Sequence, residues 1–140
     1  MNKKILVAFD NSDYAAKVMK QALELASLYN SPLLGISAID NSYFPDESNS
    51  YAADTQSYWT ESFQYMIDEC AKLADETDVF YQHELLNGNP AEEIIRYAEK
   101  NVIDFIVIGH LGKSAASGFL IGSVAQKVAA HSKCSVFIVK

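Results

Sequence analysis

Cysteine is scarce in this chain of 140 residues, which contains only two. Cys70 and Cys134 lie far apart and form neither a CxxC pair nor a cluster with the three histidines. This spacing excludes a disulfide framework and the usual cysteine-containing metal sites. We therefore expect both thiols to be buried structural side chains.

Positive charge is also in short supply. The chain has 11 Lys and Arg residues against 18 Asp and Glu residues, a formal net charge of −7. Non-specific binding to DNA, RNA or anionic lipid depends on a positive field around the protein. We expect neither nucleic acid nor a membrane as a partner.

Long apolar runs are absent. The run from Ile5 to Phe9 ends at Asp10, which is too short for the apolar region of a signal peptide, and no other stretch approaches the length of a membrane span. These absences predict a cytoplasmic protein. The length favours a single domain over residues 1–140.

Several motifs that would mark a catalytic site are missing. Gly112-Lys113-Ser114 imitates the end of a P-loop, but that motif requires a glycine where Val107 stands. No GxGxxG follows the first apolar run, and the chain has no GxSxG or HExxH sequence. These absences exclude the common dinucleotide, serine-hydrolase and zinc-protease sites.

Five short apolar segments are predicted as strands, because turn-forming residues bound them. They are Ile5–Phe9, Leu33–Ile39, Val79–Leu86, Phe105–Ile108 and Val136–Val139. Between the second and third segments, residues 40–57 are polar and show no apolar period, so we predict a long surface loop there.

Helical patterns fill the other intervals. We expect the first helix to be capped by Ser12 or Asp13 and to run to about Tyr29. The third helix begins with Asn89 as its cap and Pro90 at its first position, and it runs to about Lys100.

Apolar residues of the second helix form one stripe, namely Trp59, Phe63, Met66, Ile67, Cys70 and Leu73, and the fourth helix is expected over 122–130. Strands that alternate with helices predict an α/β fold, a single open parallel sheet of five strands with helices on both faces. Ligands bind such sheets beyond the carboxyl ends of the strands, where the strand order reverses.

Glycines cluster after the fourth strand. Two residues separate Gly109 from Gly112, and after nine more residues Gly122-Ser123 opens the last helix. Glycine allows main-chain N–H groups to approach a ligand closely, and a helix N-terminus adds unpaired N–H donors. The pattern predicts a site for the phosphates of a nucleotide. Tight turns and close helix–sheet packing are the alternative reason for these glycines.

The G-x2-G-x9-G-S pattern, with Asp10 at the end of the first strand, resembles the universal stress protein family, in which it marks the members that bind ATP. The likeness runs through the whole chain, including the segments KKILVAFD, NGNPAEEII and GSVAQKVAAHSKCSVFIVK. The resemblance implies a Rossmann-like fold of the adenine nucleotide alpha hydrolase type and a role in the stress response. It also implies a bound adenine nucleotide, ATP first, together with Mg²⁺ or Mn²⁺.

The resemblance further implies a role for individual residues. Main-chain groups of Gly109, Gly112, Gly122, Ser123 and Val124 approach the phosphates, with the Ser123 hydroxyl. The nucleoside half is implied to meet Ala8, Phe9, Asp10, Ala38 and Ile39, with Asp10 on the ribose hydroxyls or the metal ion. As alternatives from the residues alone, Asp10 is a helix-cap or turn residue and Ser123 a helix cap.

Two positions depart from the family pattern. Asn11 stands where many relatives have glycine, and Leu111 where an arginine is common, so Lys113 is a candidate substitute for that missing cation. His110 is a further candidate phosphate donor, with a solvent-exposed loop residue as the alternative. We expect His83 to be a surface residue of its strand.

Three functions remain open at this stage. The first is a nucleotide-dependent regulatory protein, and the second an interaction module that works without nucleotide through an unknown protein partner. The third is a slow ATPase. The sequence shows neither a recognisable general base nor an arginine that would stabilise the charge of the transition state. The resemblance also implies a homodimer through Val136–Val139, an apolar strand at a sheet edge.

Overall fold

The computed structural model describes residues 3–40, 50–111 and 121–140. Within them the strands are β1 (Ile5–Ala8), β2 (Leu33–Ile39), β3 (Tyr81–Asn87), β4 (Phe105–Gly109) and β5 (Ser135–Val139). The helices are α1 (Ala15–Leu28), α2 (Ser50–Asp75), α3 (Pro90–Lys100) and α4 (Ser123–His131).

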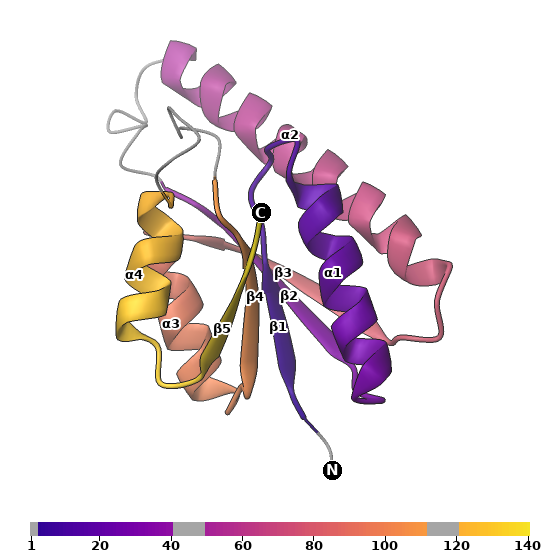
Figure 1. Cartoon of the computed structure of the whole chain (residues 1–140). Coiled ribbons are helices and arrows are strands. Elements are labelled where there is room, and N and C mark those ends of the chain that lie inside the picture. The colour runs from indigo at the N-terminus through magenta and orange to yellow at the C-terminus, as the bar shows by residue number, and fades with distance from the viewer. Residues whose placement is uncertain (1–2, 41–49, 112–120) are drawn as a thin grey trace.

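All five strands pair in parallel, in the order β3-β2-β1-β4-β5. The chain starts in the middle of the sheet, builds outward through β2 and β3, and then returns to the other side of β1 for β4 and β5. Helices α1 and α2 lie on one face and α3 and α4 on the other (Figure 1). The predicted fold class is therefore confirmed.

The core has two layers because successive side chains of a strand point to opposite faces. In β1 and the residue after it, Ile5, Val7 and Phe9 pack beneath α1 and α2. Leu6 and Ala8 pack against α3 and α4. This alternation explains why the first strand is apolar throughout: both of its faces are covered.

Two helix ends behave as their sequences predict. The side chain of Asn89 accepts a hydrogen bond from the N–H of Glu92 at 3.2 Å, with Pro90 at the first helical position of α3. Helix α1 ends at Leu28, close to the expected Tyr29, and Asn30 just beyond it has a φ of 50°, the left-handed conformation typical of the residue after a helix C-terminus.

Two expectations about the chain between strands are wrong. Helix α1 has Tyr14 at its cap position and no side-chain cap, so neither Ser12 nor Asp13 caps it. Helix α2 begins at Ser50, so residues 50–57 are helical and do not belong to a loop. Once a helix has formed, each further residue adds a main-chain hydrogen bond without a second nucleation, so a polar stretch can continue it.

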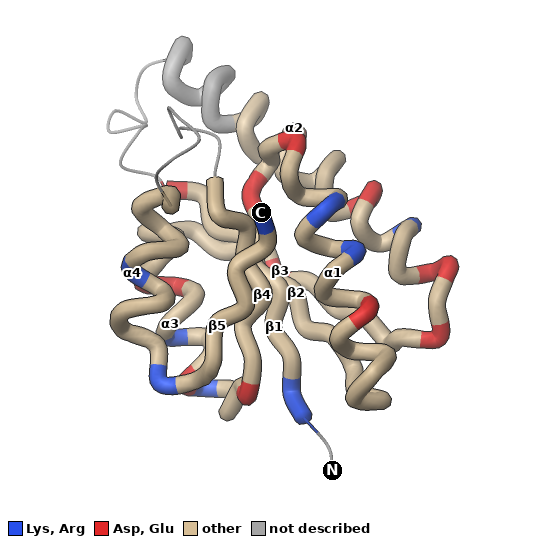
Figure 2. The backbone as a smooth tube through the Cα atoms, in the orientation of Figure 1, with Lys and Arg blue, Asp and Glu red and all other residues tan. Residues whose placement is uncertain are grey.

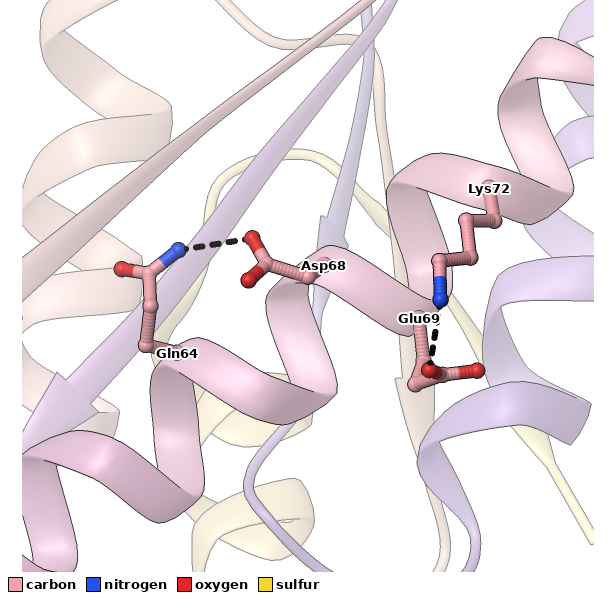
Figure 3. A network of polar contacts seen from close by, with 4 residues as sticks. All are labelled: Gln64, Asp68, Glu69 and Lys72. Carbon is pink, nitrogen blue, oxygen red and sulfur yellow. Dashed lines mark hydrogen bonds and ion pairs between the residues drawn. The ribbon is translucent and has the colours of Figure 1, made fainter.

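The outer face of α2 is polar, as its amphipathic sequence requires. Figure 3 shows the amide of Gln64 donating to Asp68 at 2.9 Å and the ammonium group of Lys72 paired with Glu69 at 3.1 Å. The inner stripe was predicted correctly, since Phe63, Ile67 and Cys70 are buried against the sheet. No helix in the described parts of the chain is long and apolar enough to span a bilayer.

Candidate functional site

The strand order reverses between β1 and β4, which lie side by side at the centre of the sheet. Their carboxyl ends therefore leave the sheet next to each other, β1 toward α1 and β4 toward α4 (Figure 1). Asp10 follows β1 by two residues, and Gly109 ends β4. The loops after β1 and β4 therefore begin side by side at one edge of the sheet.

A tight turn holds the chain after β1. Oδ1 of Asp10 accepts a hydrogen bond from the N–H of Ser12 at 2.9 Å, and the carbonyl of Ser12 accepts from the N–H of Ala15 at 3.2 Å. Asp10 thus closes a turn through its own side chain, which replaces the helix cap expected at Ser12 or Asp13. The carboxylate remains partly exposed at the sheet edge.

Asn11 fits this turn without the freedom of a glycine. Among the described residues other than glycine, only Asn30 and Val102 have a positive φ, so Asn11 is not in the left-handed conformation. Its amide nitrogen donates to the hydroxyl of Ser62 on α2 at 2.9 Å. Its Oδ1 is buried without a hydrogen-bond partner. The side chain therefore ties the β1 loop to α2.

The loop after β4 is tied to the start of α4. The N–H of Gly122 donates to the carbonyl of His110 at 2.6 Å, which closes the chain on itself across the intervening segment. Gly109 has a packing reason of its own, because a Cβ there would lie 3.1 Å from Cγ2 of Val18 on α1. The packing alternative for this glycine is thus supported at one position.

His110 is half-buried, and its contacts hold its ring in one orientation. Its N–H donates to the carbonyl of Val139 at 2.8 Å, and its Nδ1 lies 3.1 Å from the same oxygen. Its ring also makes an edge-on contact with Tyr14, with 5.8 Å between the ring centres. These contacts fix the histidine against the ends of β5 and α1.

The first turn of α4 completes the edge. Gly122 is the cap residue, so no side chain caps the helix. Ser123 is exposed, and Val124 packs partly against the core. The N–H groups of the first helical residues have no carbonyl one turn earlier to accept from them. Gly112 and Lys113, the other expected phosphate-binding residues, lie outside the described residues.

The residues expected at the nucleoside half occupy the ends of β1 and β2. Ala8 is buried toward α3 and α4, whereas the ring of Phe9 turns to the opposite face. On β2, the carbonyl of Ile39 accepts a hydrogen bond from the N–H of Gly88 at 2.8 Å, so it faces β3. Main-chain groups of successive strand residues point toward opposite neighbouring strands. Since those of Ile39 point toward β3, those of Ala38 point toward the end of β1.

His83 was assigned wrongly from the sequence. It was expected at the surface of its strand, but its ring packs on Phe9 with 4.7 Å between the centres. Its Nδ1 lies 2.5 Å from the hydroxyl of Tyr81, and its Nε2 lies 3.0 Å from the hydroxyl of Ser37. Burial lowers the pKa of His83 to about 4, so the ring is neutral near pH 7.

A signal for this cluster was present in the sequence. Gly35 lies opposite His83 in the β2–β3 ladder, and a Cβ at Gly35 would approach Nδ1 of His83 to 2.3 Å. A glycine inside a strand often marks close approach of a neighbouring group. Only the pairing of β2 with β3, however, identifies which side chain fills the space.

The side-chain charges at the edge include the carboxylates of Asp10 and Asp13 after β1 and the ammonium group of Lys140 after β5. The loops after β1 and β4 contain no Lys or Arg among their described residues, and neither does the first turn of α4 (Figure 2). Among the described residues, no three His, Cys, Asp or Glu side chains lie close enough together to hold a metal ion. Two hollows of the surface lie elsewhere, one beside Gln82 and Glu84 of β3 and one between α3 and the Lys133–Cys134 segment that precedes β5.

These features define an open parallel α/β domain with polar loops gathered at its topological switch point. The chain belongs to the universal stress protein family, whose model matches residues 1–140. A universal stress protein of Methanocaldococcus jannaschii is 33% identical over 145 residues, which cover 99% of this chain and 82% of the relative.

Solved structures of the same family share the fold. Universal stress protein UspA of Lactobacillus plantarum superposes with a TM-score of 0.89 at 22% identity, over 99% of this chain and 97% of that one. A universal stress protein in complex with cAMP gives 0.75 at 25% identity, over 99% and 97%. The Archaeoglobus fulgidus protein in complex with dAMP gives 0.67 at 22% identity, over 99% and 98%.

Proposed function

We propose that the carboxyl-terminal edge of the sheet binds an adenine nucleotide, ATP first, and that occupancy regulates the protein's partners in a stress response. One observation carries this proposal: the turn of Asp10, the end of β4 and the first turn of α4 lie around one switch point. The adenine nucleotides cAMP and dAMP in two similar structures support the choice of ligand.

The roles of the residues follow from their chemistry. Main-chain N–H groups at Ser123 and Val124 suit phosphate oxygens, because the helix N-terminus carries partial positive charge. Gly122 allows close approach of the main chain, since its own N–H already donates to the carbonyl of His110. A partly exposed carboxylate at Asp10 suits ribose hydroxyls. Main-chain groups of Ala38 suit the edge of the base. Gly112 and Lys113 extend this proposal as further phosphate contacts.

A divalent ion fits the site only together with the nucleotide. Mg²⁺ prefers six oxygen ligands and is usually held by one or two carboxylates plus substrate phosphates. Among the described residues Asp10 supplies a carboxylate at this edge, but no cluster of acidic side chains surrounds it. Mg²⁺ or Mn²⁺ would therefore enter with the phosphates, screen their charge and take one ligand from Asp10.

Calorimetric titration of nucleotide-stripped protein with ATP, with and without Mg²⁺, tests the proposal. We expect micromolar binding in the wild type and loss of binding in the Gly122→Val/Ser123→Leu variant. The φ of −57° at Gly122 accepts a side chain, so this variant should fold. Lys127→Ala, on the exposed side of α4, is the matched control and should bind as the wild type does. Undiminished ATP binding by the double variant would refute the proposed site.

Two further measurements, of partner binding and of phosphate release, separate the alternative functions. A partner bound equally well with and without ATP would favour a nucleotide-independent interaction module. Release of phosphate that disappears in Asp10→Ala would favour an ATPase, and we expect turnover to be very slow, because the described edge holds no arginine for transition-state charge.

A homodimer through β5 is part of the proposal. This strand lies at the edge of the sheet, and Phe137 in its middle is 46% exposed. An apolar edge strand with unpaired main-chain groups favours pairing with a second copy. Sedimentation at micromolar concentration should show a dimer that Phe137→Lys dissociates. A wild-type monomer under those conditions would contradict the proposal.

A further inference from the structure

Four groups form a continuous row of hydrogen bonds across three strands beneath α1 and α2. The hydroxyl of Tyr81 and Nδ1 of His83 are 2.5 Å apart, and Nε2 of His83 is 3.0 Å from the hydroxyl of Ser37. That hydroxyl donates to the main-chain carbonyl of Phe9 at 2.6 Å. The row therefore begins on β3, crosses β2, and ends just past β1.

The donor and the acceptor of each hydrogen bond in this row follow from the chemistry of the groups. Ser37 has a single hydroxyl proton, which it donates to Phe9, so toward His83 it is an acceptor. His83 must then carry its proton on Nε2. Because the ring is neutral, Nδ1 has a lone pair and accepts from the hydroxyl of Tyr81.

The row extends the pairing of two strands beyond the sheet ladder. Ala8 and Ile36 are the last paired residues of β1 and β2, and the N–H of Phe9 adds one bond to the carbonyl of Ile36 at 3.3 Å. The next link is the side chain of Ser37, which is 2% exposed. The strands are thus joined by a side chain where their own ladder stops.

Both ends of this link border the proposed nucleotide site. Ser37 precedes Ala38, and Phe9 precedes Asp10. We propose that Ser37 and His83 are positioning residues that set the spacing of Asp10 and Ala38 for the nucleoside half of the ligand. This inference rests on the proposed nucleotide site.

Packing holds the histidine in place. The ring of His83 lies against that of Phe9, and Gly35 leaves the space that Nδ1 and the Tyr81 hydroxyl occupy. Hydrogen bonds that form in such a desolvated layer have well-defined geometry, because water does not compete for them. The position of the Phe9 carbonyl therefore depends on a residue of the sheet's edge strand.

Titration of Ser37→Ala with AMP and with ATP tests the inference. Loss of one such hydrogen bond should weaken both ligands by the same factor, about three- to tenfold. The Gly122→Val/Ser123→Leu variant, in contrast, should weaken ATP more than AMP. His83→Leu should repeat the effect of Ser37→Ala, and His83→Gln should restore part of the affinity, because its amide can donate to Ser37.

Thr77→Val is the matched control for a purely structural effect. The hydroxyl of Thr77 also donates to a main-chain carbonyl, that of Ala74 at 2.7 Å, at the end of α2 far from the site. This variant should lose stability but keep its nucleotide affinity. An affinity loss in Thr77→Val equal to that in Ser37→Ala would overturn the positioning role.

Nitrogen-15 NMR of the histidine ring gives an independent readout. We expect His83 to be protonated on Nε2 at pH 7, to shift on addition of AMP, and not to shift in Ser37→Ala. A proton on Nδ1 would contradict the row. Equal affinity of wild type and Ser37→Ala, with the Gly122/Ser123 site intact, would overturn this inference alone. Absence of nucleotide binding in the wild type would remove both the site and the inference.

Discussion

The two faces of the sheet differ in what they bury. Beneath α3 and α4 the buried cluster is entirely apolar and includes Leu6, Ile106 and Val128. Beneath α1 and α2 an apolar cluster of similar make-up ends in a polar row at its carboxyl side, formed by Ser37, His83 and Tyr81. Only the face beneath α1 and α2 thus has, among the described residues, a buried polar row that reaches the edge where we propose that the nucleotide binds.

The difference has a physical cause. Burying a polar group costs free energy unless it is hydrogen-bonded, so each member of a buried row must be satisfied by the next. The row beneath α1 and α2 meets this requirement by ending on a main-chain carbonyl. Polar groups placed there specify one geometry, which apolar packing by itself does not.

Ile106→Ala breaks the apolar face and should have the largest effect on stability. Ile106 is fully buried in the centre of β4, so its truncation should lower the free energy of unfolding by about 2–5 kcal/mol. Urea denaturation followed by circular dichroism measures this loss. Leu28→Ala is the control, because Leu28 is 82% exposed and should change stability by less than about 0.5 kcal/mol.

Nucleotide affinity sharpens the same test. The folded Ile106→Ala protein should bind ATP as the wild type does, because the described residues of its face contribute no buried polar row to the edge. A loss of affinity that matches Ser37→Ala would show that the two faces do not differ in function.

Acid should weaken the polar face selectively. The pKa of His83 falls from 6.5 to about 4 in the folded protein, because burial disfavours the charged ring. Between these two values the unfolded chain binds a proton that the folded protein does not, so stability decreases as the pH falls through this window. The loss should reach at most about 3 kcal/mol near pH 4.

Comparison with His83→Gln isolates this contribution from that of the carboxylates. Urea midpoints of both proteins at pH 7, 6, 5 and 4.5 should converge as the pH falls, since glutamine does not titrate. Parallel curves for the two proteins would mean that His83 does not have a lowered pKa.

Gly35→Ala tests how tightly the row is packed. The added Cβ would lie 2.3 Å from Nδ1 of His83 and 2.8 Å from the hydroxyl of Tyr81, so both rings must move. We expect a loss of about 1–3 kcal/mol in the free energy of unfolding. The shift of His83 on addition of AMP should disappear as well. An unchanged nitrogen-15 spectrum of His83 in this variant would show that the rings of His83 and Tyr81 are not tightly packed against residue 35.

Local sequence patterns determined much of the fold. Apolar runs bounded by turns predicted all five strands to within two residues, and Asn89-Pro90 predicted the start of α3. The alternation of strands and helices then restricted the sheet to a parallel one with a reversal, which brought Asp10 and Gly109 to one edge. These features depend on residues that are close together along the chain, so they can be predicted from the order of the residues.

Tertiary contacts decided the rest. The turn of Asp10 with Ser12 displaced the expected helix cap, and helix α2 began at Ser50, so it includes the last eight residues of the predicted loop. His83 was expected at the surface because the alternation of side chains along a strand does not show whether the face on which a polar residue lies is covered. Only the pairing of β3 with β2 brings it to Ser37, 46 residues away, since hydrogen bonds of this kind depend on distance in space.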